Sequence, residues 1–170
     1  EGVGDYSGAA VAMSDDGNRV VVGAVLNKGT GLNTVGHARV YEYSSGSWSQ
    51  LGYDIDFPGD TTFNSQRFGD SVSISGDGTT VAISAPVEYV EPTRLGRVRV
   101  YTYSSSTWTL VDTIVNPISY ASGSGQTHHV SLSYNGNRLA IGYMIASGNS
   151  NNQVRVYRVV SGSSSQLGDT

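Results

Sequence analysis

The sequence contains no cysteine and a single lysine, Lys28. Without cysteine, the chain has no disulfide framework and no thiolate metal site. The formal net charge is −4, so the chain lacks a basic field that would hold a nucleic-acid backbone, and we predict no nucleic-acid partner. It also lacks a run of about 20 apolar residues, and we therefore expect no membrane span.

Leucine, glutamate and lysine, the residues that fill helices, are scarce, whereas 22 glycines and 11 tyrosines accompany many serines and valines. This composition is typical of strands joined by tight turns, and it predicts an all-β protein. A surface rich in serine, threonine, glycine, asparagine and tyrosine resembles that of microbial and algal cell-surface proteins. The resemblance favours an extracellular or cell-surface location over an intracellular one, although the lack of cysteine fits both.

One pattern occurs three times along the chain. Its first part reads VAMSDDGNRVVVGA, VSISGDGTTVAISA and VSLSYNGNRLAIGY, and the turn glycines are 61 and 58 residues apart at Gly17, Gly78 and Gly136. A second part follows in each copy and reads HARVYEYSSGSWSQLG, RVRVYTYSSSTWTLVD and QVRVYRVVSGSSSQLG. We therefore divide a single repeat domain, 1–170, into repeats 1–60, 61–119 and 120–170, of which the last is incomplete.

Each repeat predicts four short antiparallel strands. In the second copy, residues 71–75 and 80–85 alternate on either side of an Asp-Gly turn, and residues 97–103 and 108–114 form the next pair. A unit of roughly 57 residues cannot bury both faces of its own sheet, so it must stack on similar units. The expected third strand carries Val98 and Val100 on one face and Tyr101 and Tyr103 on the other, which indicates a sheet covered on both faces. We predict an all-β β-propeller of about three four-stranded antiparallel blades, within a ring of about six or seven blades or closed by oligomerisation. A β-solenoid is the alternative, although its coils are usually shorter.

The segment FGDSVSISGDGTTVAISAP, residues 68–86, resembles the FG-GAP repeats of integrin-type propellers. Together with GRVRVYTYSSSTWTLV, it resembles the tandem arrays of such repeats in secreted proteins of marine bacteria and algae. The resemblance implies a propeller and a surface or extracellular role, and it implies no catalytic residue. Integrin repeats often bind calcium through a DxDxDG loop. The turns here hold at most two acids each and are too short to wrap an ion, so we expect no metal and no cofactor.

Candidate catalytic residues are few. His128 and His129 are adjacent on an expected strand, where they point to opposite faces and cannot hold one metal ion together. His37 precedes the third strand of another copy, and we interpret all three histidines as solvent-exposed or inter-blade residues. The acids Asp54, Asp56 and Glu88 could serve a glycosidase only if two of them converged. We interpret them as solvated loop charges and predict no catalytic residue and no enzyme activity, with a propeller hydrolase as the minor alternative.

Aromatic residues recur at fixed repeat positions. Trp48 and Trp108 are equivalent, and the third copy has Ser164 there. These tryptophans either pack between blades or stack on a ligand such as a sugar ring, and both readings stay open. Three arginines each precede an equivalent tyrosine by two residues, which predicts stacked Arg/Tyr ladders between blades, at Arg39, Arg99 and Arg155.

The repeats differ most in the loops at 26–35, 87–95 and 144–152, which join the second strand to the third. We expect these loops to share one rim and to carry a partner or ligand site. Three blades also leave two lateral sheet faces that need covering. The predicted function is therefore a non-catalytic extracellular module for adhesion, protein–protein interaction or structural assembly, with other copies of itself or other surface proteins as partners. A carbohydrate-binding lectin propeller, with glycans as ligands, is the alternative.

Overall fold

The computed structural model describes residues 2–29, 33–59, 61–90, 93–94, 96–115, 126–145, 152–160 and 164–168. Within these ranges the chain forms strands, turns and no helix, so the predicted all-β class is confirmed. It follows that the described residues contain no helix that is long and apolar enough to cross a membrane.

Three antiparallel sheets follow one another along the chain. The first contains β1 (Ser7–Met13), β2 (Arg19–Ala24), β3 (His37–Ser44) and β4 (Ser47–Gln50), and β5 (Ile55–Asp56) also pairs with β3. The second contains β6 (Val72–Ile74), β7 (Thr80–Ala85), β10 (Arg97–Ser104) and β11 (Thr107–Val115). The third contains β12 (Gln126–Leu132), β13 (Arg138–Ile145), β14 (Gln153–Arg158) and β15 (Ser165–Leu167). A small ribbon of β8 (Tyr89–Val90) and β9 (Thr93–Arg94) extends from the second sheet's loop.

The first hairpin of each sheet has the same turn. The turn glycines adopt positive φ angles of 71°, 69° and 68° at Gly17, Gly78 and Gly136, a conformation that glycine reaches without steric cost. Side-chain hydrogen bonds within each turn stabilise it. In the first turn the Ser14 hydroxyl donates to the Asp16 carboxylate, and the Asn18 backbone N–H donates to the same oxygen. These hydrogen bonds lower the pKa of Asp16, with the Ser14 hydroxyl as the largest cause.

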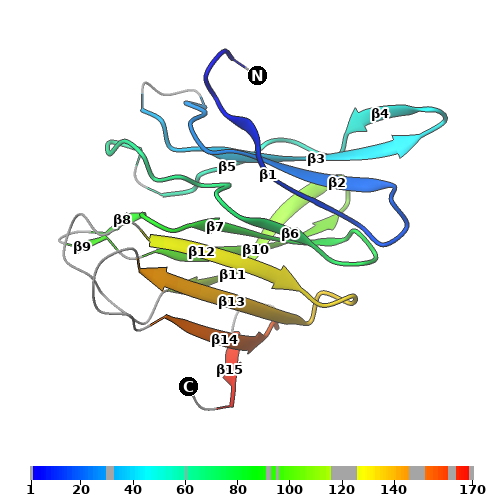
Figure 1. Cartoon of the computed structure of the whole chain (residues 1–170). Helices are drawn as coiled ribbons and strands as arrows, with labels where there is room; N and C mark the ends of the chain where they lie inside the picture. Colours follow the sequence, from blue (N-terminus) through cyan, green and yellow to red (C-terminus); the bar gives the residue numbers. More distant parts are fainter. Residues whose placement is uncertain are drawn as a thin grey trace.

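The three sheets lie one above another, with the N-terminus at the top and the C-terminus at the bottom of Figure 1. The first strand of the second sheet, β6, lies against both β1 and β12. One hydrophobic cluster fills the space between the first and second sheets, and another lies between the second and third. Strand β10 contributes Tyr101 to the first cluster and Val98 and Val100 to the second. The expectation that its sheet is covered on both faces is therefore confirmed.

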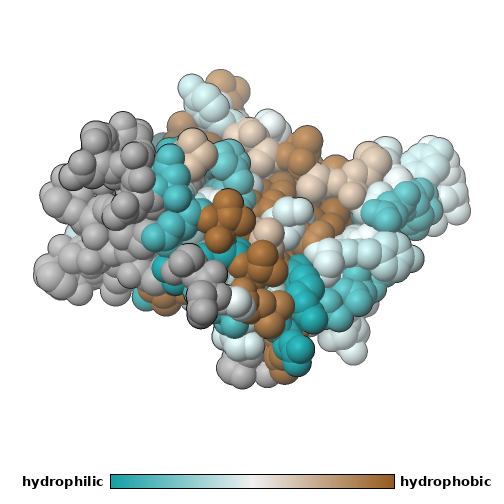
Figure 2. Space-filling model, turned by 60° about the horizontal axis from the view of Figure 1, so that its bottom comes forward, coloured by the Kyte–Doolittle hydropathy of each residue, from teal (hydrophilic) through white to brown (hydrophobic). Residues whose placement is uncertain are grey.

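Within the described ranges, no further sheet lies on the outer face of the first sheet or on that of the third (Figure 1). Seen from the lower end of the molecule, the surface carries groups of hydrophobic residues between hydrophilic ones (Figure 2). The division into repeats 1–60, 61–119 and 120–170 stays a prediction. So does the shared rim of the three variable loops, because residues 30–32, 91–92, 95 and 146–151 lie outside the described ranges.

Candidate functional site

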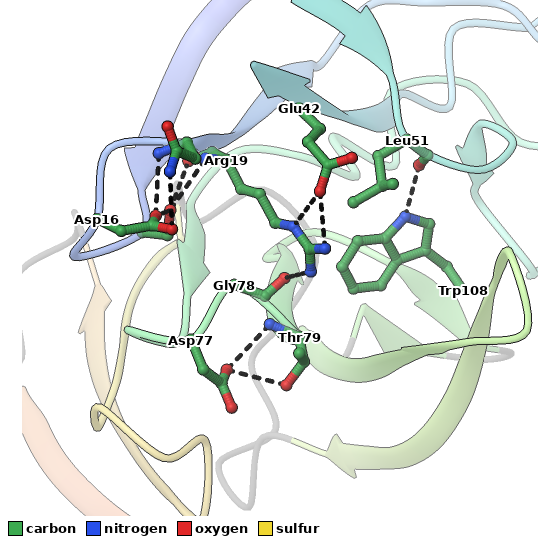
Figure 3. Close-up of polar contacts among 10 residues, drawn as sticks. Asp16, Arg19, Glu42, Leu51, Asp77, Gly78, Thr79 and Trp108 are labelled. Carbon is green, nitrogen blue, oxygen red and sulfur yellow. Dashed lines mark hydrogen bonds and ion pairs between the residues drawn. The ribbon is translucent and has the colours of Figure 1, made fainter. Parts of the chain in front are cut away.

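The contact between the first and second sheets is held by a tryptophan (Figure 3). The Trp108 indole nitrogen, on β11, donates a 2.8 Å hydrogen bond to the backbone carbonyl of Leu51, which follows β4. The next residue, Gly52, has a φ of 77°, and a Cβ there would lie 3.0 Å from Cδ1 of Trp108. Leu51 thus accepts the indole hydrogen bond, and Gly52 leaves room for the indole ring.

The backbones of the first and second sheets also approach each other closely in this contact. A Cβ added to Gly23 on β2 would lie 2.1 Å from the carbonyl oxygen of Gly69, so the two chains approach as closely as glycine allows. The Arg19 guanidinium donates to the Gly78 carbonyl at 3.0 Å and pairs with Glu42 at 2.8 Å, which ties the two sheets together (Figure 3).

Hydrogen bonds between turns connect the first sheet to the second and the second to the third. The Asp15 N–H donates to the Gly76 carbonyl at 3.1 Å, and the Gly76 N–H donates to the Tyr134 carbonyl at 2.8 Å. These three residues hold equivalent turn positions, so each turn donates to the turn of the next sheet. In the third copy, Ser164 holds the position of the tryptophan. Its backbone N–H donates a 2.7 Å hydrogen bond to the Asp112 carboxylate of the second sheet.

We call the outer face of the first sheet the leading face, defined by Val11, Met13, Tyr43 and Trp48. Its residues are the repeat equivalents of Val72, Ile74, Tyr103 and Trp108, which pack against the first sheet. Val72 and Trp108 are 7% and 9% exposed, whereas Val11 and Trp48 are 63% and 46% exposed. Residue types suited to burial are therefore exposed on the leading face, which no described strand covers.

We call the outer face of the third sheet the trailing face, defined by Gly142, Val154, Val156 and Leu167. Its valines are equivalent to Val98 and Val100 of the second sheet, which are 1% and 0% exposed against the third sheet. Val154 and Val156 are 72% and 37% exposed. The trailing face is thus a second apolar surface, at the opposite end of the stack.

The two tryptophans predicted as candidate ligand-stacking residues have different surroundings. Trp108 lies in the contact between sheets, while Trp48 lies on the leading face, 5.4 Å from the Tyr43 ring centroid. Ligand stacking stays a prediction, and of the two only Trp48 presents an exposed ring.

The interpretation of Glu88 as a solvated loop charge was wrong. Glu88 is 1% exposed, accepts hydrogen bonds from Arg99 at 2.7 and 2.8 Å, and accepts another from Arg97 at 2.7 Å. The expected Arg/Tyr ladder is not found at this position either, since the Arg99 guanidinium lies over the rings of Phe57 and Phe68. Two arginines close together in the second repeat were the sequence signal for a buried acid between them.

A second polar cluster lies on the side of β3 that faces away from the second sheet. Nδ1 of the buried His37 is 3.8 Å from Asp54 and 3.9 Å from Asp56, so one imidazole and two carboxylates converge. Arg39 already binds Asp54 through two hydrogen bonds, and this lowers the pKa of Asp54 to about 2. The sequence pointed to Asp54 and Asp56, but we interpreted His37 as a solvent-exposed or inter-blade histidine and did not connect it with them. Because the Arg39 guanidinium compensates the charge of Asp54, we assign no metal to this cluster.

The remaining sequence candidates do not form a catalytic constellation within the described residues. His128 is buried edge-on against the Tyr143 ring, with centroids 5.1 Å apart, and His129 is exposed on the other side of β12. Burial lowers the pKa of His128 to about 4. A pocket of about 280 Å³ between the second and third sheets is bordered by Thr80, Thr102 and Asn135, and no described residue lining it is titratable.

Two solved structures share the fold of this chain. A prolyl endopeptidase is 18% identical and matches 92% of the chain with a TM-score of 0.54. The periplasmic gluconolactonase of Pseudomonas aeruginosa is 19% identical and matches 89% with a TM-score of 0.52. The chain spans only 20% and 39% of the lengths of those two proteins. No protein-family model and no curated protein matches the sequence.

These likenesses confirm the predicted propeller-type fold, and the three sheets are its blades. They also correct one prediction. We expected the chain not to be an enzyme, yet the prolyl endopeptidase and the gluconolactonase are both enzymes, so the architecture gives no ground for excluding catalysis. At 18 and 19% identity the likeness shows the fold alone, and it transfers no catalytic residue.

Proposed function

We propose that the chain is an extracellular β-propeller repeat module, of the FG-GAP-like kind, that acts in adhesion or structural assembly by binding proteins through its lateral sheet faces. The observation that carries the proposal is the pair of open apolar faces at the two ends of the stack. Residues of equivalent position are buried or half-buried where a neighbouring blade covers them, and they are exposed on these faces. A protein partner with a similar sheet face would bury both surfaces.

The extracellular location has its own support. The resemblance to secreted repeat arrays and the lysine-poor, serine-rich composition favour it, and one structure of the same fold is periplasmic. Detection of the full-length protein on the surface of intact cells by an antibody against this chain would test the location. Signal only after permeabilisation would contradict it.

Carbohydrate binding is the second candidate, because Tyr43 and Trp48 form an exposed aromatic pair on the leading face. Paired rings of this kind can stack on a sugar. Glycan-array binding that is lost in Trp48→Ala and kept in Tyr53→Ala, a change at another exposed aromatic residue, would favour this candidate over protein assembly.

The experiment that tests assembly is light scattering over a dilution series, combined with aggregation of beads coated with the chain. We expect association in the micromolar range for the unmodified chain. Val11→Lys on the leading face and Val154→Lys on the trailing face should each weaken it, because either change places a charge in an apolar contact. Association that is unchanged in both variants would contradict the proposal.

A further inference from the structure

We infer that the trailing face of one chain is the docking site for the leading face of a second copy, in the register that joins the blades within the chain. The inference rests on the proposed assembly function and specifies its partner and geometry. Its basis is that three contacts between the first and second blades each have one half present on the leading face and the matching half present on the trailing face.

The tryptophan contact is the first such pair. Inside the chain, Trp108 donates to the carbonyl of Leu51, and the following Gly52 has a φ of 77°. The trailing face repeats this Leu-Gly pair at Leu167 and Gly168, where Gly168 has a φ of 75°. The leading face carries the equivalent donor, Trp48, with an exposed ring. We therefore place the Trp48 indole of one copy on the Leu167 carbonyl of the other.

The glycine contact is the second pair. Gly23 lies against the carbonyl of Gly69, whose φ is 93°. Gly142 on the trailing face is equivalent to Gly23, and a Cβ added there would meet no atom closer than 3.9 Å. Gly8 on the leading face is equivalent to Gly69, has a φ of 91°, and is open in the same way. Two glycines suited to a close backbone contact thus lie on opposite faces.

The turn contact is the third pair. Asp15 donates to Gly76, and Gly76 donates to Tyr134, so the series runs from one blade to the next. Continued by one step, the Tyr134 N–H donates to the Asp15 carbonyl of a second copy. Three independent pairs, spread from the turns to the outer strands, therefore agree on one register.

This interface is heterologous, since it joins two different faces. Two chains joined by two such contacts would close a ring of six blades, which is within the range that propellers form. If the rotation does not close, the same contact would produce a filament. In both cases every leading face is covered by a trailing face.

The test compares three variants with the unmodified chain by light scattering across a dilution series. Gly142→Ala meets nothing closer than 3.9 Å within its own chain, so we expect it to fold normally, which circular dichroism checks. In the docked register its Cβ meets the Gly8 carbonyl of the second copy, and the dissociation constant should rise at least about 100-fold. Trp48→Phe, which keeps a ring and loses the N–H donor, should raise it about tenfold. Tyr53→Ala, at an exposed aromatic residue outside both faces, should leave it unchanged.

The outcomes separate the register from the proposed function. Association that falls in Gly142→Ala and Trp48→Phe and persists in Tyr53→Ala supports both. If Val154→Lys weakens association while Gly142→Ala and Trp48→Phe leave it unchanged, the proposed register is wrong. Assembly through the two faces would then still stand. A chain that stays monomeric throughout the micromolar range overturns the docking of a second copy, and binding to other surface proteins is then tested separately with the Val11→Lys and Val154→Lys variants.

Discussion

Glu88 and Arg99 form a buried ion pair in the second blade, in which both carboxylate oxygens accept hydrogen bonds of 2.7 and 2.8 Å from the guanidinium. Arg97 donates to the same carboxylate. The guanidinium of Arg99 also lies over the rings of Phe57 and Phe68. Glu88 therefore compensates the charge of the buried Arg99 inside the contact between the first two blades.

Loss of the negative charge should be costly, because it leaves the buried Arg99 without compensation. We expect Glu88→Gln to lower the free energy of unfolding by about 3 kcal/mol, measured by urea denaturation. The matched change Glu42→Gln, in a partly exposed pair with Arg19, should cost less than about 1 kcal/mol. Equal losses in the two variants would show that burial of the pair is not what decides its contribution.

We expect substitution of the two tryptophans to have unequal effects on the free energy of unfolding. Trp108→Phe removes the donor to Leu51 and leaves a void between blades, and we expect a loss of about 2 kcal/mol in the free energy of unfolding. Trp48→Phe, measured on dilute protein, should stay within about 0.5 kcal/mol of the unmodified chain. A similar loss in both would contradict the assignment of Trp108 to the inter-blade contact.

The equivalent glycines Gly23 and Gly142 give a second matched comparison. Gly23→Ala places a methyl group 2.1 Å from the backbone carbonyl oxygen of Gly69, so the backbone must shift, and we expect a loss of about 3 kcal/mol or more in the free energy of unfolding. Gly142→Ala has open space and should leave the stability of the dilute chain unchanged or slightly raised. Thermal unfolding of both variants at low protein concentration measures the difference.

The pH dependence of stability should contain a contribution from His128. Burial lowers its pKa from 6.5 to about 4, so the unfolded chain takes up a proton here below about pH 6.5 while the folded chain does not. The free energy of unfolding should therefore fall as the pH falls from about 6.5 to 4, by at most about 1.4 kcal/mol per pH unit. At higher pH this residue should contribute no slope.

The control for this prediction is the neighbouring histidine. Denaturation at several pH values should show that His128→Phe removes that part of the slope and that His129→Ala retains it. A slope unchanged in His128→Phe would assign the pH dependence to other groups.

Much of the fold could be predicted from the repeat. Turn glycines at fixed spacing and period-two alternation predicted the strands, and the mixed faces of β10 predicted a sheet covered on both sides. The candidate sites were harder to predict. Glu88 looked like a loop charge because its partners follow it by 9 and 11 residues and reach it only in the folded loop. His37 was not connected with Asp54 and Asp56 because these acids follow it by 17 and 19 residues and come close to it only when β5 pairs with β3.

The sequence by itself determined the secondary structure and the equivalence of the blades, because both follow from local periodicity and turn chemistry. It therefore determined that Trp48 and Trp108 hold the same position. Only the tertiary structure decided that one is buried and the other exposed, since exposure depends on whether a neighbouring sheet covers the position. Stacking likewise made Gly23 a close contact and left Gly142 open, because that contact lies between residues 46 apart in the sequence.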